Sequence, residues 1–172
     1  MCPPTDELDL PSQGARAVRS GSFGQSSIES GFKIYGVPTV NDNLEFHYDC
    51  DFWERKEKLL IRQHTLASGW TIDFLYKNFA IKQTLPIEVK NQMGSGTADE
   101  KLAYTVDRLE ASGYPVFWLV LSGGGFNPAV VKDADKKIKK LNAKGMVKGR
   151  LVYDEKSLLQ RAIERLVERN EP

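Results

Sequence analysis

The stretch Trp70–Lys101, WTIDFLYKNFAIKQTLPIEVKNQMGSGTADEK, decides the fold of this chain. Two short apolar runs within it contain charged residues: Asp73 in the first run, and Glu88 and Lys90 in the second. Alternation and β-branched or aromatic content predict that both runs are strands. A charge inside such a strand is costly unless it is paired or bound to a metal. These three charges therefore predict a functional site.

Three strands are expected around these charges. They cover Lys58–Thr65, Trp70–Lys77 and Leu85–Asn91. The turn Ala67–Gly69 and the connection Asn78–Gln83 that separate them are short. Short links favour antiparallel neighbours, because a parallel pair needs a longer crossover. The centre of the chain is therefore predicted to be an antiparallel meander.

The N-terminal part carries little periodicity. Residues 1–20 mix Pro, Gly, Ser and charges and predict a loose arm. That arm is either a solvated tail or a segment whose Arg16 and Arg19 contact nucleic-acid phosphates. A short helix is expected over Ser22–Ser30, with Glu29 near its end.

A strand-like segment, Phe32–Val40, follows this helix and leads into the irregular, acidic stretch Asn41–Trp53. Four residues of that stretch are of metal-binding type: His47, Asp49, Cys50 and Asp51. Their spacing matches no standard zinc site, so a solvated loop or insertion is predicted here.

The C-terminal half alternates helices and strands. Thr97 and Glu100 form a capping box, which predicts a helix start after a glycine-rich turn. The elements expected from there are a helix to Ser112, an apolar central strand Tyr114–Leu121, a helix Pro128–Ala143, a strand Arg150–Tyr153 and a helix Glu155–Arg169. The order predicts a mixed α/β sheet, antiparallel at one side and crossover-connected at the other.

Length and composition bound the class of protein. The chain has 172 residues, 41% hydrophobic and 27% charged, with a net charge of +1, as expected of one soluble domain spanning 1–172. Its two cysteines, Cys2 and Cys50, form no disulfide framework and indicate free thiols in a reducing cytoplasm. No apolar run approaches the ~18 residues of a membrane span, and the polar, proline-rich start is unlike a secretory signal.

The charged strand residues have a defined chemistry. Asp73 and Glu88 lie on adjacent predicted strands, and two carboxylates at one point suit a hard divalent cation, Mg²⁺ or Mn²⁺. Glu88 and Lys90 are two positions apart, so both side chains project from one face. A lysine there can orient the attacking water, and the carbonyl of Val89 can provide a further metal ligand. The set predicts metal-assisted phosphodiester hydrolysis.

The turn after these strands adds an anion site. Gly94–Glu100 places backbone N–H groups at a helix start, where a phosphate is favoured. Ser95 and Thr97 are therefore candidate DNA contacts.

Asp73, then Glu88-Val89-Lys90 in an apolar strand, then a helix and the apolar strand Tyr114–Leu121, resembles the PD-(D/E)XK nuclease superfamily. The resemblance runs from about Ser22 to Leu121 and implies an αβββαβ core. The last helix, strand and helix of the chain are additions to that core.

A longer pattern narrows the resemblance. Glu88-x-Lys90-x-Gln92, followed by residues 95–101 (SGTADEK), resembles type II restriction endonuclease-like members. The chain departs from the family at one position, where Ile72 stands in place of the Pro before the Asp.

The resemblance assigns roles by position. It implies that Asp73 and Glu88 are metal ligands and that Lys90 orients the water. It also implies that Glu29 on the first helix joins the site. Polar support from the third strand and the following helix would come from Gln92 and Lys101, the latter also a candidate DNA contact.

The activity that the resemblance implies is Mg²⁺-dependent cleavage of double-stranded DNA, with Mn²⁺ able to substitute. A type II restriction endonuclease would cut at a specific site as a homodimer and leave 5′-phosphates. Two other functions remain open at this stage: a structure-specific nuclease (Holliday-junction resolvase or repair nickase), and a non-catalytic nucleic-acid-binding module. Sequence recognition is expected from Tyr35–Lys56 or from the lysine-rich helix around Lys132–Lys148, which could equally be a solvated face.

Overall fold

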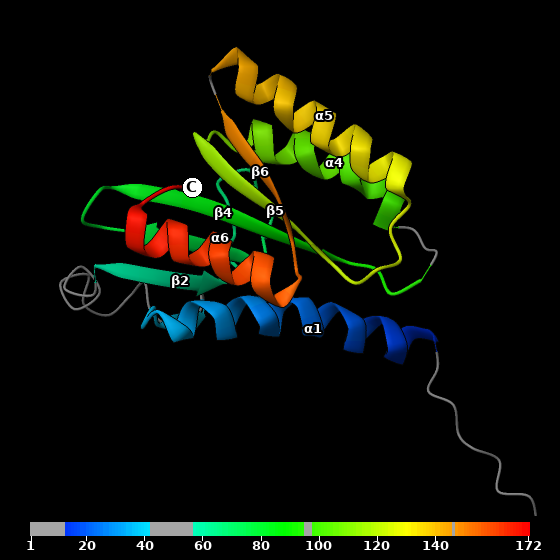
Figure 1. Ribbon diagram of the computed structural model, residues 1–172, viewed down its shortest axis with the longest axis horizontal. Helices are drawn as coiled ribbons and strands as arrows, with labels where there is room; N and C mark the ends of the chain where they lie inside the picture. The colour runs from blue at the N-terminus through cyan, green and yellow to red at the C-terminus, as the bar shows by residue number, and fades with distance from the viewer. Residues whose placement is uncertain (1–12, 42–56, 95–97, 146) are drawn as a thin grey trace, which may run out of the picture.

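The computed structural model describes residues 13–41, 57–94, 98–145 and 147–172 (Figure 1). In these ranges four helices pack around one six-stranded sheet. The helices are α1 (Gln13–Ile34), α4 (Ala98–Ala111), α5 (Pro128–Lys144) and α6 (Lys156–Arg169). The strands are β1 (Thr39–Asn41), β2 (Lys58–Arg62), β3 (Phe74–Asn78), β4 (Gln83–Asn91), β5 (Val116–Ser122) and β6 (Lys148–Tyr153).

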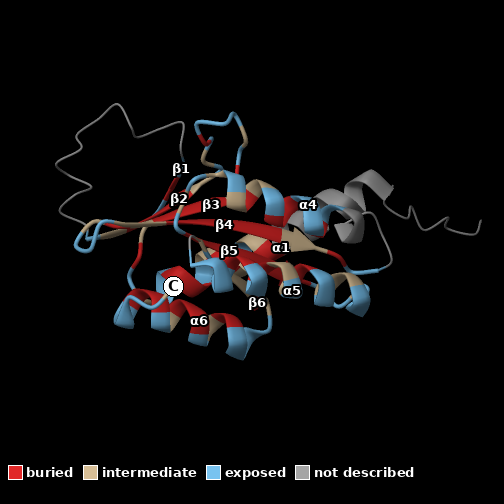
Figure 2. Cartoon of the chain, turned by 90° about the horizontal axis from the view of Figure 1, so that it is seen from above, coloured by how far each residue is buried: buried red, intermediate tan, exposed pale blue. Residues whose placement is uncertain are grey.

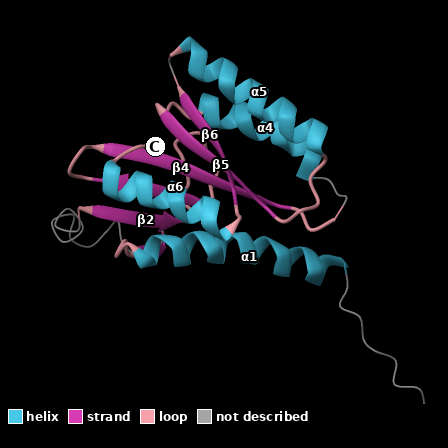
Figure 3. Cartoon of the chain, viewed as in Figure 1, coloured by secondary structure: helices cyan, strands magenta, loops and turns pink. Residues whose placement is uncertain are grey.

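The sheet has two halves that meet at β4. Its strand order follows the chain, from β1 to β6. β2, β3 and β4 form the predicted antiparallel meander, and β5 and β6 add parallel strands beyond it. α4 and α5 make the crossovers to β5 and β6 (Figure 3). The predicted mixed α/β class is therefore confirmed.

Helices cover both faces of the sheet (Figures 1 and 2). Ile87 and Val89 of β4 pack in a core cluster with residues of α1 and α6. On the other face, Leu119 and Leu121 of β5 pack with residues of α4 and α5. Glu88 is paired with Leu119, and Lys90 with Leu121, and side chains alternate along a strand. Both charged residues of β4 therefore lie on the face covered by α4.

The strands β2 and β3 are shorter than predicted. β2 ends at Arg62 because Gln63 adopts a left-handed backbone (φ 52°), which turns the chain out of the sheet. The chain returns through the bridge between Thr65 and Thr71, and Leu66 is buried in this excursion. β3 consequently begins at Phe74, so Asp73 stands immediately before the strand and not within it.

The N-terminal helix is longer than predicted. α1 begins at Gln13, so residues 13–20, predicted as part of an arm, are helical. The prediction of a strand over Phe32–Val40 is wrong over most of its length, because Phe32 is in α1 and fully buried, and β1 begins only at Thr39. Glycine and serine hide the helical period in this segment, and packing of the apolar face stabilises it nonetheless.

Three predicted features fall wholly or partly outside the described residues: the first twelve residues of the arm, the acidic stretch with His47, Asp49, Cys50 and Asp51, and the turn with Ser95 and Thr97. Among the helices described, none combines the length and apolar character needed to cross a membrane.

Candidate active site

The site is built where β3 begins beside β4. The β3–β4 ladder ends with the pair Phe74 and Ile87, and Asp73 and Glu88 are the next residues beyond it. The backbone N–H of Val89 donates to Oδ2 of Asp73 at 2.7 Å. The carboxylate of Asp73 thus takes the place of a backbone acceptor at the end of the β3–β4 ladder.

Helix α1 supplies the second bond to this carboxylate. Gly24 lies against the sheet so closely that a Cβ there would be 2.9 Å from Val89 Cγ1 and from Ser122 Cβ. The close approach brings Gln25 to the site, and its Nε2 donates to Oδ1 of Asp73 at 2.6 Å. Both oxygens of Asp73 are therefore held by donors.

Glu88 and Lys90 form a buried ion pair beside it. Lys90 Nζ lies 2.5 Å from Glu88 Oε1, and the two side chains are 22% and 7% exposed. The second oxygen, Glu88 Oε2, is buried and has no hydrogen-bond partner. A buried carboxylate oxygen without a donor is costly, which makes this atom the strongest sign that a ligand belongs here.

The pKa values of the two carboxyl groups also indicate a cation site. Burial raises the pKa of Glu88 to about 7, and the neighbouring charge of Asp73 adds to this, while Lys90 opposes it. Burial also raises the pKa of Asp73, against the hydrogen bonds from Val89 and Gln25. Two acids that each resist ionisation in this way would be relieved by a cation between them.

A hard divalent cation fits these donors. Carboxylate and carbonyl oxygens are its preferred ligands, and the unbonded Oε2 of Glu88 is available to it. In the parts of the chain that the structure describes, no group of three or more His, Cys, Asp or Glu could hold a metal. Two carboxylates leave most coordination positions for backbone, water and substrate oxygens, as Mg²⁺ sites commonly do.

Glu29 lies near the site with a partner of its own. Its Oε1 is 3.3 Å from Nη1 of Arg62, at the end of β2. The charge of Arg62 in turn acts to lower the pKa of Asp73. Neither Arg62 nor Gln25 was predicted. Gln25 is four residues before Glu29, one helical turn away on the same face, and that spacing was the available signal.

Gln92 fastens the end of β4 to the loop after β5. Its Nε2 donates to the carbonyl of Gly125 at 2.8 Å, and the Gly125 N–H donates to the Gln92 carbonyl at 2.8 Å. Gly125 is packed so tightly that a Cβ would lie 2.4 Å from the backbone nitrogen of Gly94. The buried amide therefore has a structural contact next to the site.

The candidate DNA contacts are spread over the molecule. Lys101 is exposed on α4. Arg16 and Arg19 are in α1, and the structure describes the backbone alone at these positions. Ser95 and Thr97 lie outside the described residues.

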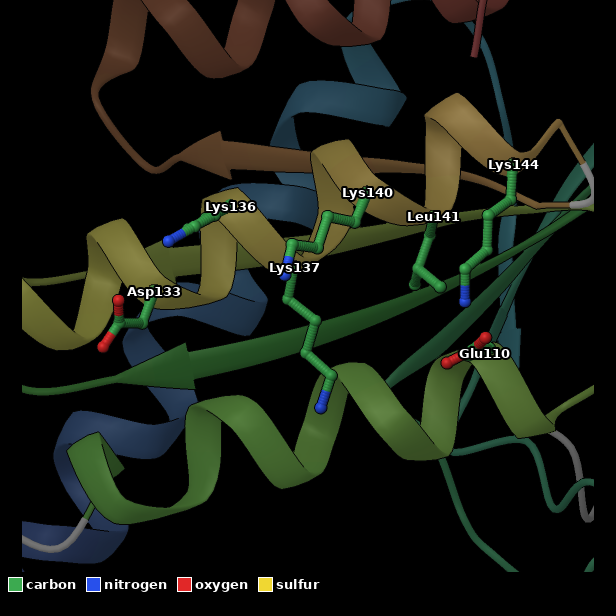
Figure 4. A pocket seen from close by; sticks show the side chains of 7 residues that line it. All are labelled: Glu110, Asp133, Lys136, Lys137, Lys140, Leu141 and Lys144. Atoms are coloured by element: carbon green, nitrogen blue, oxygen red, sulfur yellow. The ribbon is translucent and has the colours of Figure 1, made fainter.

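The lysine-rich helix α5 borders a cleft of about 440 Å³ with α4, here called the α4–α5 cleft (Figure 4). Its lining residues are Glu110, Asp133, Lys136, Lys137, Lys140, Leu141 and Lys144. Lys137 reaches across to α4, where it pairs with Asp107 and donates to the carbonyl of Ala103 at 3.3 Å. The cleft thus holds charges of both signs.

A comparison with known families agrees with this geometry. The model of a PD-(D/E)XK nuclease superfamily domain matches residues 16–166, and the chain belongs to this superfamily. The match includes most of α1, the whole sheet and most of α6, and therefore extends beyond the predicted core. No curated protein and no solved structure gives a significant match. The domain is thus a metal-dependent nuclease in the general sense, with nucleic acid as its substrate.

Proposed function

We propose that this protein is a Mg²⁺-dependent type II restriction endonuclease that cuts double-stranded DNA at a specific site and leaves 5′-phosphates. The observation that carries the proposal is the buried pair of Glu88 and Lys90 beside Asp73, with one oxygen of Glu88 unbonded. An ion pair with Lys90 needs only Oε1 of Glu88 and leaves Oε2 buried without a partner. A metal ion at the site would bond to Oε2.

Asp73, Glu88 and the carbonyl of Val89 would hold the metal. In a strand, the N–H and C=O of one residue point towards the same neighbouring strand. The N–H of Val89 points to Asp73, so its carbonyl faces the same side, where β3 has not yet begun. Three oxygen donors would then converge, and Mn²⁺ would be accepted by the same set.

The bound metal would supply Lewis-acid stabilisation of the charge that develops on the phosphate oxygens. Lys90 would donate a hydrogen bond to the attacking water and hold it in line with the scissile bond. The water oxygen would bond to phosphorus as the water gives up a proton to solvent, and the bond to the 3′ oxygen would break as that oxygen takes up a proton from solvent. The 5′-phosphate and 3′-hydroxyl ends follow from this order of events.

The remaining residues would position these groups. Gln25 and the Val89 N–H fix the rotamer of Asp73. Glu29 holds Arg62 in a position from which its positive charge can balance the negative charge of Asp73. Gln92 would keep the end of β4 in place through Gly125. Each acts on the reaction through a neighbour, which makes its role one of positioning.

One chain carries one such centre, so a cut through both strands needs two chains. A homodimer with two-fold symmetry would present two centres to a palindromic site. Such an enzyme would meet its DNA in the cytoplasm.

The test is digestion of plasmid and phage DNA with Mg²⁺, with Mn²⁺ and with a chelator, followed by sequencing of the fragment ends. Discrete, metal-dependent fragments with 5′-phosphates are expected, and Lys90→Ala and Asp73→Asn should abolish them. The control is Lys156→Ala, which changes an exposed lysine at the start of α6. Cleavage by either site variant at the wild-type rate would overturn the mechanism.

Two other results would reassign the function within the same fold. Selective cutting of four-way junctions, with plasmid left intact, would indicate a junction resolvase. Binding of DNA without metal-dependent cleavage would indicate a non-catalytic module.

A further inference from the structure

Three residues on α4 form a row, here called the α4 strip: the exposed Lys101 and Tyr104, and the half-buried Arg108. They are three and four positions apart and share one side of the helix. Lys101 is exposed, and Tyr104 is 60% exposed, which is unusual for so large an aromatic side chain. The strip therefore combines two cations with an accessible ring.

Arg108 is held in place by aromatic rings. Its Cζ lies 4.2 Å from the ring centroid of Trp70 and 5.7 Å from that of Tyr104. Among the residues that the structure describes, no carboxylate forms an ion pair with this guanidinium. Stacking uses the face of a guanidinium and leaves its in-plane N–H donors available. The guanidinium is therefore held in position by the rings, and the described part of the chain provides no anion for it.

The strip lies beside the candidate active site. α4 follows β4 in the chain and covers the face of the sheet that carries Glu88 and Lys90. Trp70, which supports Arg108, is three residues before Asp73 and packs between the core under α4 and the core under the β2–β3 connection. A nucleic-acid strand that reaches the carboxylates from this side would pass the strip.

The α4–α5 cleft is a poorer site for a phosphate chain. Its lysines share the cleft with Glu110 and Asp133 (Figure 4), and Lys137 is already paired with Asp107. Paired and mixed charges attract an anion less than the two cations of the strip, for which the described residues provide no ion pair.

We propose that the α4 strip binds the phosphodiester backbone of the DNA strand that enters the active site. Arg108 clamps one phosphate with two N–H donors, and Lys101 bonds another, because seven residues of helix separate the two by ~10 Å. The ring of Tyr104 packs against the deoxyribose between them. The proposal rests on the DNA cleavage proposed above and identifies one surface that holds that substrate.

Salt dependence of binding tests the proposal directly. Phosphate contacts are independent of base sequence, so a fluorescently labelled duplex of arbitrary sequence serves as the probe, with chelator present to prevent cleavage. The logarithm of affinity falls linearly with the logarithm of salt, with a slope of about 0.9 for each phosphate contact. Arg108→Gln and Lys101→Gln should each lower that slope by about 0.9, and the double variant by about twice as much.

Matched control variants distinguish phosphate binding by the α4 strip from a general effect of the protein's positive charge. Lys140→Gln and Lys144→Gln in the α4–α5 cleft remove the same charge from a nearby helix and should leave the slope unchanged. Arg108→Lys should keep the slope and weaken binding, because the two-pronged contact is lost. Tyr104→Ala should weaken binding several-fold, and Tyr104→Phe should not.

Equal slope losses at the cleft and the strip, or an unchanged slope in the strip variants, would overturn the proposal. Arg108 packs on Trp70, so thermal melting must show that its variants are folded; the exposed Lys101 gives an independent result. If the wild type binds through the strip yet never cleaves DNA, the proposed function fails and the strip stands. If it cleaves and the strip variants cleave and bind like the wild type, the strip fails alone.

Discussion

Replacement of Glu88 by Gln should remove the pH dependence of stability that this carboxyl gives the metal-free protein above about pH 4.5. Burial, with the nearby charge of Asp73, raises the pKa of this carboxyl from 4.5 to about 7. Between pH 4.5 and about pH 7, Glu88 therefore keeps its proton in the folded protein but has lost it in the unfolded chain. It follows that the wild type loses stability as pH rises from about 4.5 through about 7, whereas Glu88→Gln has no such proton to lose.

The size of the effect follows from the two pKa values. They differ by about 2.5 units, and each unit is worth about 1.36 kcal/mol, so the wild type should lose about 3 kcal/mol relative to the variant. The value is an upper one, because the free carboxylate can draw in water. Bound Mg²⁺ would neutralise the pair, and saturating metal should restore most of the loss at pH 8.

Urea unfolding in chelator, at intervals from pH 4.5 to pH 8, measures this difference. The exposed acid Glu168, changed to Gln, is the control and should follow the wild type. Parallel pH profiles for wild type and Glu88→Gln would refute the electrostatic argument. A wild-type profile that Mg²⁺ leaves unaltered would refute the assignment of Glu88 to the metal.

Three further predictions concern the surroundings of the carboxylates. Gln25→Ala removes a donor from Asp73 and should lower kcat by about tenfold, the cost of a ~1.4 kcal/mol hydrogen bond, with a melting temperature near that of the wild type. Gly24→Ala should destabilise the fold by about 1–3 kcal/mol in urea unfolding, because its Cβ would overlap the sheet, while Gly124→Ala, which meets open space, should be near neutral. Arg62→Met removes a charge that lowers the pKa of Asp73, so in a pH–rate profile the acidic limb should move to higher pH; an unmoved limb would contradict this coupling.

Sequence alone defined most of the fold because the period of the apolar residues is strong in the C-terminal half. The apolar strand β5 and the helices after it were predicted to within two residues at each end. The meander was predicted from short links between alternating runs, and this topology is confirmed. These are features in which local pattern and tertiary packing agree.

The errors occur where tertiary contacts override local pattern. At Gln63 the chain leaves the sheet in a left-handed backbone conformation, which the pattern of apolar residues does not predict. Glycines and serines in α1 lower its intrinsic helix propensity, yet Gly24 is the residue that lets the helix approach Val89. The features that weaken the helical pattern are thus among those that position Gln25.

The charged residues of the apolar strands could be predicted as site residues, whereas the partners of Asp73 from α1 and β2 could not. Asp73, Glu88 and Lys90 stood out because charges in apolar strands are costly. Gln25 and Arg62 stand in segments where polar side chains are ordinary, so only the packing of α1 and β2 brings them to Asp73. Their contributions to catalysis remain predictions.

The bond from the Val89 N–H to Asp73 means that this carboxylate is also part of the scaffold on which it acts. Lys90 bonds to the side chain of Glu88 and leaves the backbone ladder unaffected. A descendant of this domain that gave up cleavage would be selected to keep Asp or Asn at position 73, for the integrity of the sheet, and would be free to lose Lys90. The lysine is therefore the better marker by which to separate active from inactive relatives.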